Sequence, residues 1–108
     1  MTDLELYRAA QLHRREGKDV VMAIVVESKG SSPREAGAKM LILPNGEILG
    51  TIGGGEGEAK VHKAGLEILW KEKNSQILKL YLTAEAGSSS GDICGGQIAV
   101  LLEYLPAF

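Results

Sequence analysis

Residues 38–57 read AKMLILPNGEILGTIGGGEG, and this stretch decides the fold. Two apolar segments flank Pro44-Asn45-Gly46, and Asn-Gly is the strongest short-range signal of a β-hairpin because both residues tolerate positive φ. The second segment runs into Gly53-Gly54-Gly55, after which a broad apolar face predicts a helix from about Glu56 to Lys73. The stretch therefore predicts a hairpin that leads through three glycines into a helix covering a sheet.

The rest of the chain predicts one more helix and three more strands. Thr2 and Glu5 form a capping-box sequence at the start of the first helix, and Gly17 is a natural C′ stop. The expected core face of this helix comprises Leu6, Ala9, Ala10, Leu12 and His13. The strands are expected at residues 20–26, 38–43, 47–52, 76–83 and 97–105. We expect an α+β fold, a single domain over residues 1–108 with a mixed sheet of about five strands and two helices.

Composition and charge restrict the class of protein. The chain has 108 residues, 44% of them hydrophobic, and a formal net charge of −2, without a basic stripe that would favour nucleic acid. No apolar run reaches the roughly 18–20 residues of a membrane span, so no membrane partner is expected. The single cysteine fits a reducing compartment and the acidic N-terminus shows no secretory signal, so we expect a cytoplasmic protein.

Glycine is enriched in the loops. Twelve of the 14 glycines lie in two stretches, 30–57 and 87–96. If the chain alternates up and down, the loops after the first, third and fourth strands all leave the sheet in the same direction. Ligands of open sheets with crossover helices bind outside the carboxyl ends of strands, so these loops are the candidate site.

Each loop has two interpretations. The glycines at 53–55, before a helix, suit a phosphate or another anion, or they form a tight-packing turn. Arg34, with Ser31 and Ser32, can hold a phosphate or carboxylate, or it is an ordinary surface arginine. Cys94 is either an exposed thiolate near backbone amides or a small buried hydrophobe. His13 and His62 fall on predicted helices and are interpreted as surface or packing residues.

Three motifs in this order resemble the N-terminal domain of the XdhC/CoxI family, the xanthine dehydrogenase and carbon monoxide dehydrogenase accessory factors. They are residues 30–34 with 37–40, residues 50–55 with Glu58, and residues 94–96 with Glu103. Members of the family continue into a C-terminal Rossmann-like domain, whereas this chain stops at Phe108. The resemblance therefore predicts a short form or one half of a split pair.

The resemblance implies maturation of molybdenum hydroxylases by binding the molybdenum cofactor (molybdopterin) and aiding its sulfuration or insertion. The implied cofactor-binding residues are Ser31, Ser32, Arg34, Gly53, Gly54, Gly55, Glu58, Cys94, Gly95 and Gly96. Cys94 is also the implied ligand to the cofactor molybdenum. The implied partners are a molybdenum hydroxylase apo-enzyme, a cysteine desulfurase and a separate Rossmann-like subunit.

Two other functions compete with this carrier function. One is a non-catalytic interaction subunit that pairs with a Rossmann-like partner. The other is a small enzyme that uses Cys94 on a phosphorylated ligand, which the absence of a base near Cys94 in the sequence disfavours. The exposed edges of a small sheet indicate self-association, and we expect a homodimer.

Overall fold

The computed structural model describes residues 1–30, 35–82 and 96–108. The elements in chain order are α1 (Asp3–Arg15), β1 (Val20–Lys29), β2 (Lys39–Ile42), β3 (Ile48–Gly50), α2 (Gly55–Glu67), the π-helical turn η1 (Ile68–Glu72), β4 (Gln76–Leu82) and β5 (Gly96–Leu105). The predicted α+β class, with two helices and five strands in this order, is confirmed.

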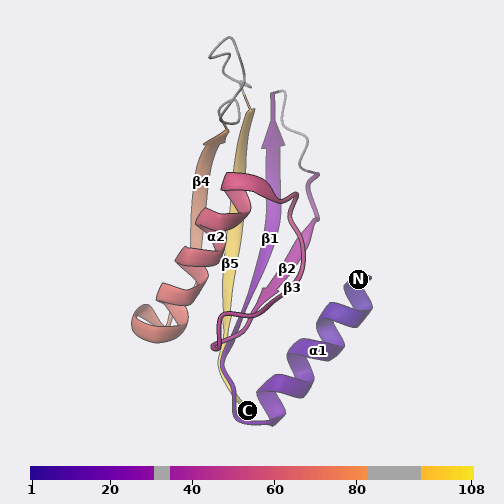
Figure 1. Cartoon of the computed structure of the whole chain (residues 1–108), viewed down its shortest axis with the longest axis vertical. Coiled ribbons are helices and arrows are strands. Elements are labelled where there is room, and N and C mark those ends of the chain that lie inside the picture. Colours follow the sequence, from indigo (N-terminus) through magenta and orange to yellow (C-terminus); the bar gives the residue numbers. More distant parts are fainter. Residues whose placement is uncertain (31–34, 83–95) are drawn as a thin grey trace.

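The five strands form one sheet in the order β3-β2-β1-β5-β4, and every neighbouring pair is antiparallel (Figure 1). The expectation of a mixed sheet is therefore wrong. Strands β1, β3 and β4 do run in the same direction, as predicted. However, β2 separates β3 from β1 and β5 separates β1 from β4, so no two parallel strands are neighbours.

The two helices pack on opposite faces of the sheet. Strand β1 contributes buried side chains to both faces of the sheet, because successive side chains of a strand point to opposite sides. Val21, Ala23 and Val25 join the core beneath α2, whereas Val20 and Met22 join the smaller core beneath α1. The predicted burial of this strand on both faces is confirmed for residues 20–23.

Helix α1 begins at the predicted capping box. The Glu5 N–H donates to Thr2 Oγ1 (3.1 Å), and the Thr2 N–H donates to Glu5 Oε1 (2.9 Å). Leu6 and Ala10 are buried, but Leu12 is 56% exposed, so its place on the predicted core face is wrong. Leu12 lies roughly 200° around the helix from Ala10 and points away from the sheet.

Helix α2 and η1 pack on the sheet through part of the broad apolar face that the sequence predicts. Val61, Ile68 and Leu69 of that predicted face are buried, whereas Ala59 and Trp70, which the sequence also places on it, are exposed. Gly65 is also buried, and its missing side chain lets the helix approach Ile42 of the sheet closely. No helix in the described ranges is long and apolar enough to span a membrane.

Two side chains, one from α2 and one from η1, contact the turn between β2 and β3. His62 Nε2 lies 2.8 Å from the Gly46 carbonyl oxygen, and Trp70 Nε1 donates to the Pro44 carbonyl (3.3 Å). Gly46 has φ of +94°, as the predicted Asn-Gly turn requires. These contacts fix the lower edge of the sheet, where the turn lies.

Candidate functional site

The glycine junction, residues 50–58, connects β3 to α2. Gly53, Gly54 and Gly55 have consecutive φ values of +121°, +73° and +68°. Side chains other than glycine rarely adopt such values, so this path from strand to helix depends on glycine. The sequence prediction of a glycine turn before a helix is confirmed.

Gly50 is required by a close approach as well as by its φ of +79°. A Cβ atom at this position would lie 2.8 Å from the Lys39 carbonyl oxygen and 3.2 Å from Leu6 Cδ1. The end of β3 therefore lies tightly between β2 and α1. This contact fixes where the glycine junction begins.

The carboxylate of Glu58 accepts the hydrogen bonds that hold the glycine junction together. Its Oε1 accepts hydrogen bonds from Thr51 Oγ1 (2.5 Å), the Ile52 N–H (3.1 Å) and the Gly54 N–H (3.2 Å). The Thr51 hydroxyl also accepts the Gly53 N–H (3.0 Å). The chain's own carboxylate thus binds two backbone amides of the junction, one of which, that of Gly54, lies among the glycines predicted to bind an external anion.

The start of α2 keeps further N–H groups for an anion. The N–H groups of Gly55 and Glu56 belong to the first helical turn and have no acceptor within a helix. Both residues are exposed, and a Cβ on the N-cap residue Gly54 would meet no atom within 4 Å. An anion that approached here would meet these groups together with the positive end of the helix dipole.

The glycine junction begins below the upper edge of the sheet. Strands β1 and β4 end at this edge and β5 begins there, with Lys29 and Tyr81 both paired to Gln97. Gly50, in contrast, lies level with Met40 and therefore with Ala23, six residues below Lys29 along β1. Figure 1 shows α2 starting below the ends of β1 and β5. The loops leave the sheet in one direction but at different heights.

The structure therefore brings together four of the predicted site residues, Gly53, Gly54, Gly55 and Glu58. Gly96 lies at the upper edge as the first residue of β5, paired with Leu82. Ser31, Ser32, Arg34, Cys94 and Gly95 lie outside the described residues, so their assignment to the site stays a prediction.

Lys39 has a structural partner that sequence reasoning missed. Its ammonium donates to Asp3 Oδ2 (2.7 Å) and to the Gly37 carbonyl (3.0 Å), and its side chain is only 12% exposed. The hydrogen bond to Asp3 raises the pKa of Lys39 above its ordinary value. The pair ties the start of α1 to β2 across 36 residues, which no local pattern reveals.

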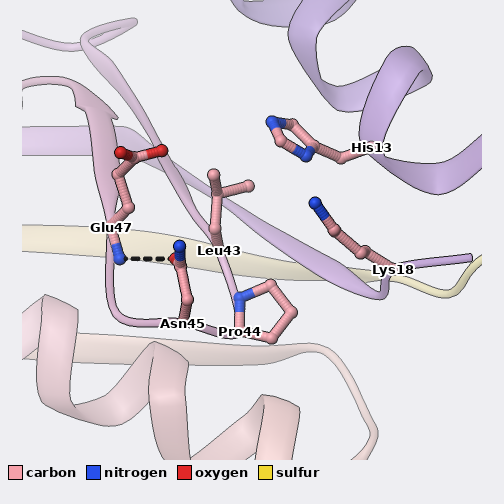
Figure 2. A pocket seen from close by; sticks show the side chains of 6 residues that line it. All are labelled: His13, Lys18, Leu43, Pro44, Asn45 and Glu47. Carbon is pink, nitrogen blue, oxygen red and sulfur yellow. Dashed lines mark hydrogen bonds between the residues drawn. The ribbon is translucent and has the colours of Figure 1, made fainter. Parts of the chain in front are cut away.

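A cavity of about 270 Å³ lies at the lower edge, between the end of α1 and the β2–β3 turn (Figure 2). Its lining residues are His13, Lys18, Leu43, Pro44, Asn45 and Glu47. His13 Nδ1 is buried without a hydrogen-bond partner among the described residues, 3.7 Å from Glu16 Oε1. None of the predicted site residues lines this cavity, and the described ranges hold no group of side chains suited to a metal ion.

The fold and the glycine junction define a small α+β domain in which a hairpin leads through glycines into a helix. The chain matches the XdhC and CoxI family over residues 13–81, and it belongs to this family. The predicted resemblance is confirmed.

Two relatives show how much of a longer protein the chain represents. It is 37% identical over 81 residues to the uncharacterized protein YqeB of Escherichia coli K12, covering 75% of this chain and 15% of YqeB. A crystal structure described as a xanthine dehydrogenase from Bacillus halodurans superposes with a TM-score of 0.75 at 30% identity. That match covers 96% of this chain and 30% of the other. The chain thus spans less than a third of either relative.

Proposed function

We propose that the chain is an accessory module in the maturation of molybdenum hydroxylases of the xanthine dehydrogenase type. In this proposal it holds the molybdenum cofactor as cargo and aids its sulfuration or its insertion into the apo-enzyme. Membership of the XdhC and CoxI family supports the class of function, as does the similarity to a structure described as a xanthine dehydrogenase. The observation that carries the proposal is the glycine junction at the start of α2.

The junction fits the phosphate of molybdopterin. A phosphate is bound well where backbone N–H groups point outward at a helix start and no side chain blocks them. Gly54 leaves such space, because nothing lies within 4 Å of the position of its absent Cβ. Glu58 keeps the loop in this shape, and its carboxylate is already compensated by three donors from the chain itself.

The negative charge at the start of α2, which we call the entrance of the site, opposes anion binding less than the sequence suggests. Glu56 lies in the first turn of α2 and would repel an anion, but Lys60 Nζ lies 3.3 Å from its carboxylate. Arg34, if it lies near this entrance, would add a guanidinium for the phosphate, and Cys94 would add a thiolate for the metal. These two roles belong to the proposal and rest on the family resemblance.

A carrier function is favoured over an enzyme by the positions of the two imidazoles. His62 contacts the Gly46 carbonyl at the lower edge, and His13 lines the cavity there. Neither histidine lies at the glycine junction, where a base would be needed to activate a nucleophile. The proposal therefore assigns substrate turnover to partners, which are the client apo-enzyme, a cysteine desulfurase and a Rossmann-like subunit.

The proposal is tested by the cofactor content of protein co-produced with the cofactor pathway, measured as pterin fluorescence after oxidation. Gly54→Ala is compared with Gly46→Ala, because both glycines have positive φ and open space around the absent Cβ. We expect Gly54→Ala, Arg34→Ala and Cys94→Ser to lower the pterin yield several-fold, and Gly46→Ala to leave it unchanged. Equal yields from all four variants and the unmodified protein would contradict the site.

A further inference from the structure

The face of the sheet opposite α2 is only partly covered. Helix α1 packs over β1 and β2 at one end, where Ile24 and the terminal Leu105 of β5 are partly buried against its core. In the described ranges no helix packs on β4 or on the upper part of β5 on that side. Ile77 and Tyr81 of β4 are consequently 61% and 70% exposed, although neighbouring Leu80, which points to α2, is buried. We call the surface formed by β4, the upper part of β5 and β1 from the partly buried Ile24 to Lys29 the open face.

The strand register arranges the open face in three rows, each with one residue from β4, β5 and β1. The rows are Ile77–Leu101–Ile24, Lys79–Ala99–Glu27 and Tyr81–Gln97–Lys29. The first row is wholly apolar, the second has opposite charges at its two ends, and the third has an aromatic ring and a cation at its ends. Strand β5 is the middle column of all three rows.

We propose that the open face binds the open face of a second copy of this chain. The two copies are related by a two-fold axis that lies between the two sheets, parallel to β5. Such an axis exchanges the β4 and β1 columns between copies. Ile77 then packs on the partner's Ile24, and Leu101 packs on its own equivalent. Aligned sheets pack about 10 Å apart, so the apolar row of each copy is buried against that of the other.

Charge complementarity identifies a second copy as the occupant. The same axis places Lys79 opposite the partner's Glu27, and the symmetry repeats this ion pair on the other side. It also places Tyr81 opposite the partner's Lys29, where a cation–π contact can form. Among the described residues, Glu27 forms an ion pair with Lys29 alone (3.2 Å). Both side chains are more than half exposed and so accessible to a partner.

Two other self-associations are disfavoured by like charges. Pairing of the exposed edges of two β4 strands, centred on Lys79, would set two lysines side by side. Pairing through the outer face of α1, where Leu4, Tyr7 and Leu12 are exposed, would bring Arg8 and Arg15 of both copies together. The open face is the apolar surface whose charges match their own symmetry mates.

Analytical ultracentrifugation of the full chain tests the interface at micromolar and near-millimolar concentrations. We expect a dimer that Ile77→Asp converts to a monomer, whereas the matched control Leu12→Asp, on the outer face of α1, stays dimeric. Both side chains are more than half exposed, and circular dichroism verifies that each variant is folded. A monomeric parent protein, or a dimer that Leu12→Asp dissociates and Ile77→Asp does not, overturns the proposal.

A charge exchange tests the orientation of the two copies. Lys79→Glu and Glu27→Lys should each raise the Kd of the dimer about tenfold or more, because each replaces an attraction by a repulsion on both sides of the axis. Mixing the two variants should restore association as a heterodimer, since every Glu then faces a Lys. Failure of the mixture to associate more tightly than either variant alone overturns the proposed axis. This result is independent of cofactor binding.

Discussion

Gly65 of α2 lies directly against Ile42 of β2, so that a Cβ atom on Gly65 would stand 2.4 Å from Ile42 Cδ1. Alanine in place of a helical glycine ordinarily stabilises a helix by about 1 kcal/mol. Here we predict the opposite sign for Gly65→Ala, a loss of about 1–3 kcal/mol, because the added methyl group overpacks the core. Urea unfolding of the variant measures this change.

Ile42→Val provides the matched test, because valine lacks the Cδ1 atom that the new methyl group would meet. The Gly65→Ala substitution should cost less free energy of unfolding in the Ile42→Val background than in the parent protein. Additive effects of the two substitutions would show that they do not compete for the same space.

Asp19 joins the start of β1 to two distant segments and should make the stability depend on pH. Its carboxylate accepts hydrogen bonds from Lys73 Nζ (3.0 Å), the Tyr104 hydroxyl (2.9 Å) and the Ala107 N–H (2.9 Å). The Ala107 N–H bond, followed by the Lys73 and Tyr104 bonds, lowers the pKa of Asp19 below its ordinary value. The ionised form is thus the one that the fold favours.

A lowered pKa in the folded state gives stability that is complete above the unfolded pKa, about 3.9 for aspartate. That stability is lost as the pH falls through the lower folded pKa. We predict that Asp19→Asn is less stable than the parent protein at pH 7 and that the difference shrinks below about pH 4. Urea titrations from pH 7 to pH 3 measure it, and a difference independent of pH would contradict this account.

Glu58 should matter more for stability than Glu56, two residues away in the same helical turn. Glu58→Ala leaves three donors without their acceptor, and we predict a loss of about 1–3 kcal/mol. Glu56 forms only an exposed i,i+4 pair with Lys60, so Glu56→Ala should change stability by less than about 0.5 kcal/mol. Hydrogen exchange at the Gly54 N–H should accelerate in the first variant and not in the second.

The capping box at the start of α1 gives a simpler prediction. Thr2→Ala should lower the free energy of unfolding by about 1 kcal/mol, because the Glu5 N–H loses its acceptor. Thr2→Ser retains the hydroxyl and should be close to the parent protein. Thermal unfolding of the three proteins compares them, and equal midpoints for alanine and serine would exclude a contribution from the cap.

Local signals explain the parts of the fold that could be predicted from the sequence. The capping box at Thr2 and the Asn45-Gly46 turn act within a few residues, and the structure has both. The insertion of β5 between β1 and β4 could not be read from the sequence, because strand pairing over long separations leaves no periodic pattern. For the same reason the predicted mixed sheet is wrong.

The candidate site was predictable in part. The glycines at 53–55 identify the junction because only glycine adopts its three positive φ values. The charge of Glu58 did not predict that its carboxylate accepts hydrogen bonds from the junction. An acidic residue in the first turn of a helix is equally explained by its favourable interaction with the helix dipole. The spacing of Thr51 and Glu58, seven residues apart across the glycines, is the signal that would have indicated it.

The interior position of β5, between β1 and β4, also determines when this domain can fold during synthesis. Strand β5 is synthesised after the other described elements of this domain, yet it pairs with both β1 and β4, matching Val20 to Leu105 at one end. A nascent chain that stops before residue 96 therefore lacks the strand that joins its two halves. Closure of such distant contacts is entropically slow, so folding of the domain must await completion of the C-terminal strand. Until then β1 and β4 each present an unpaired edge to chaperones and to other chains.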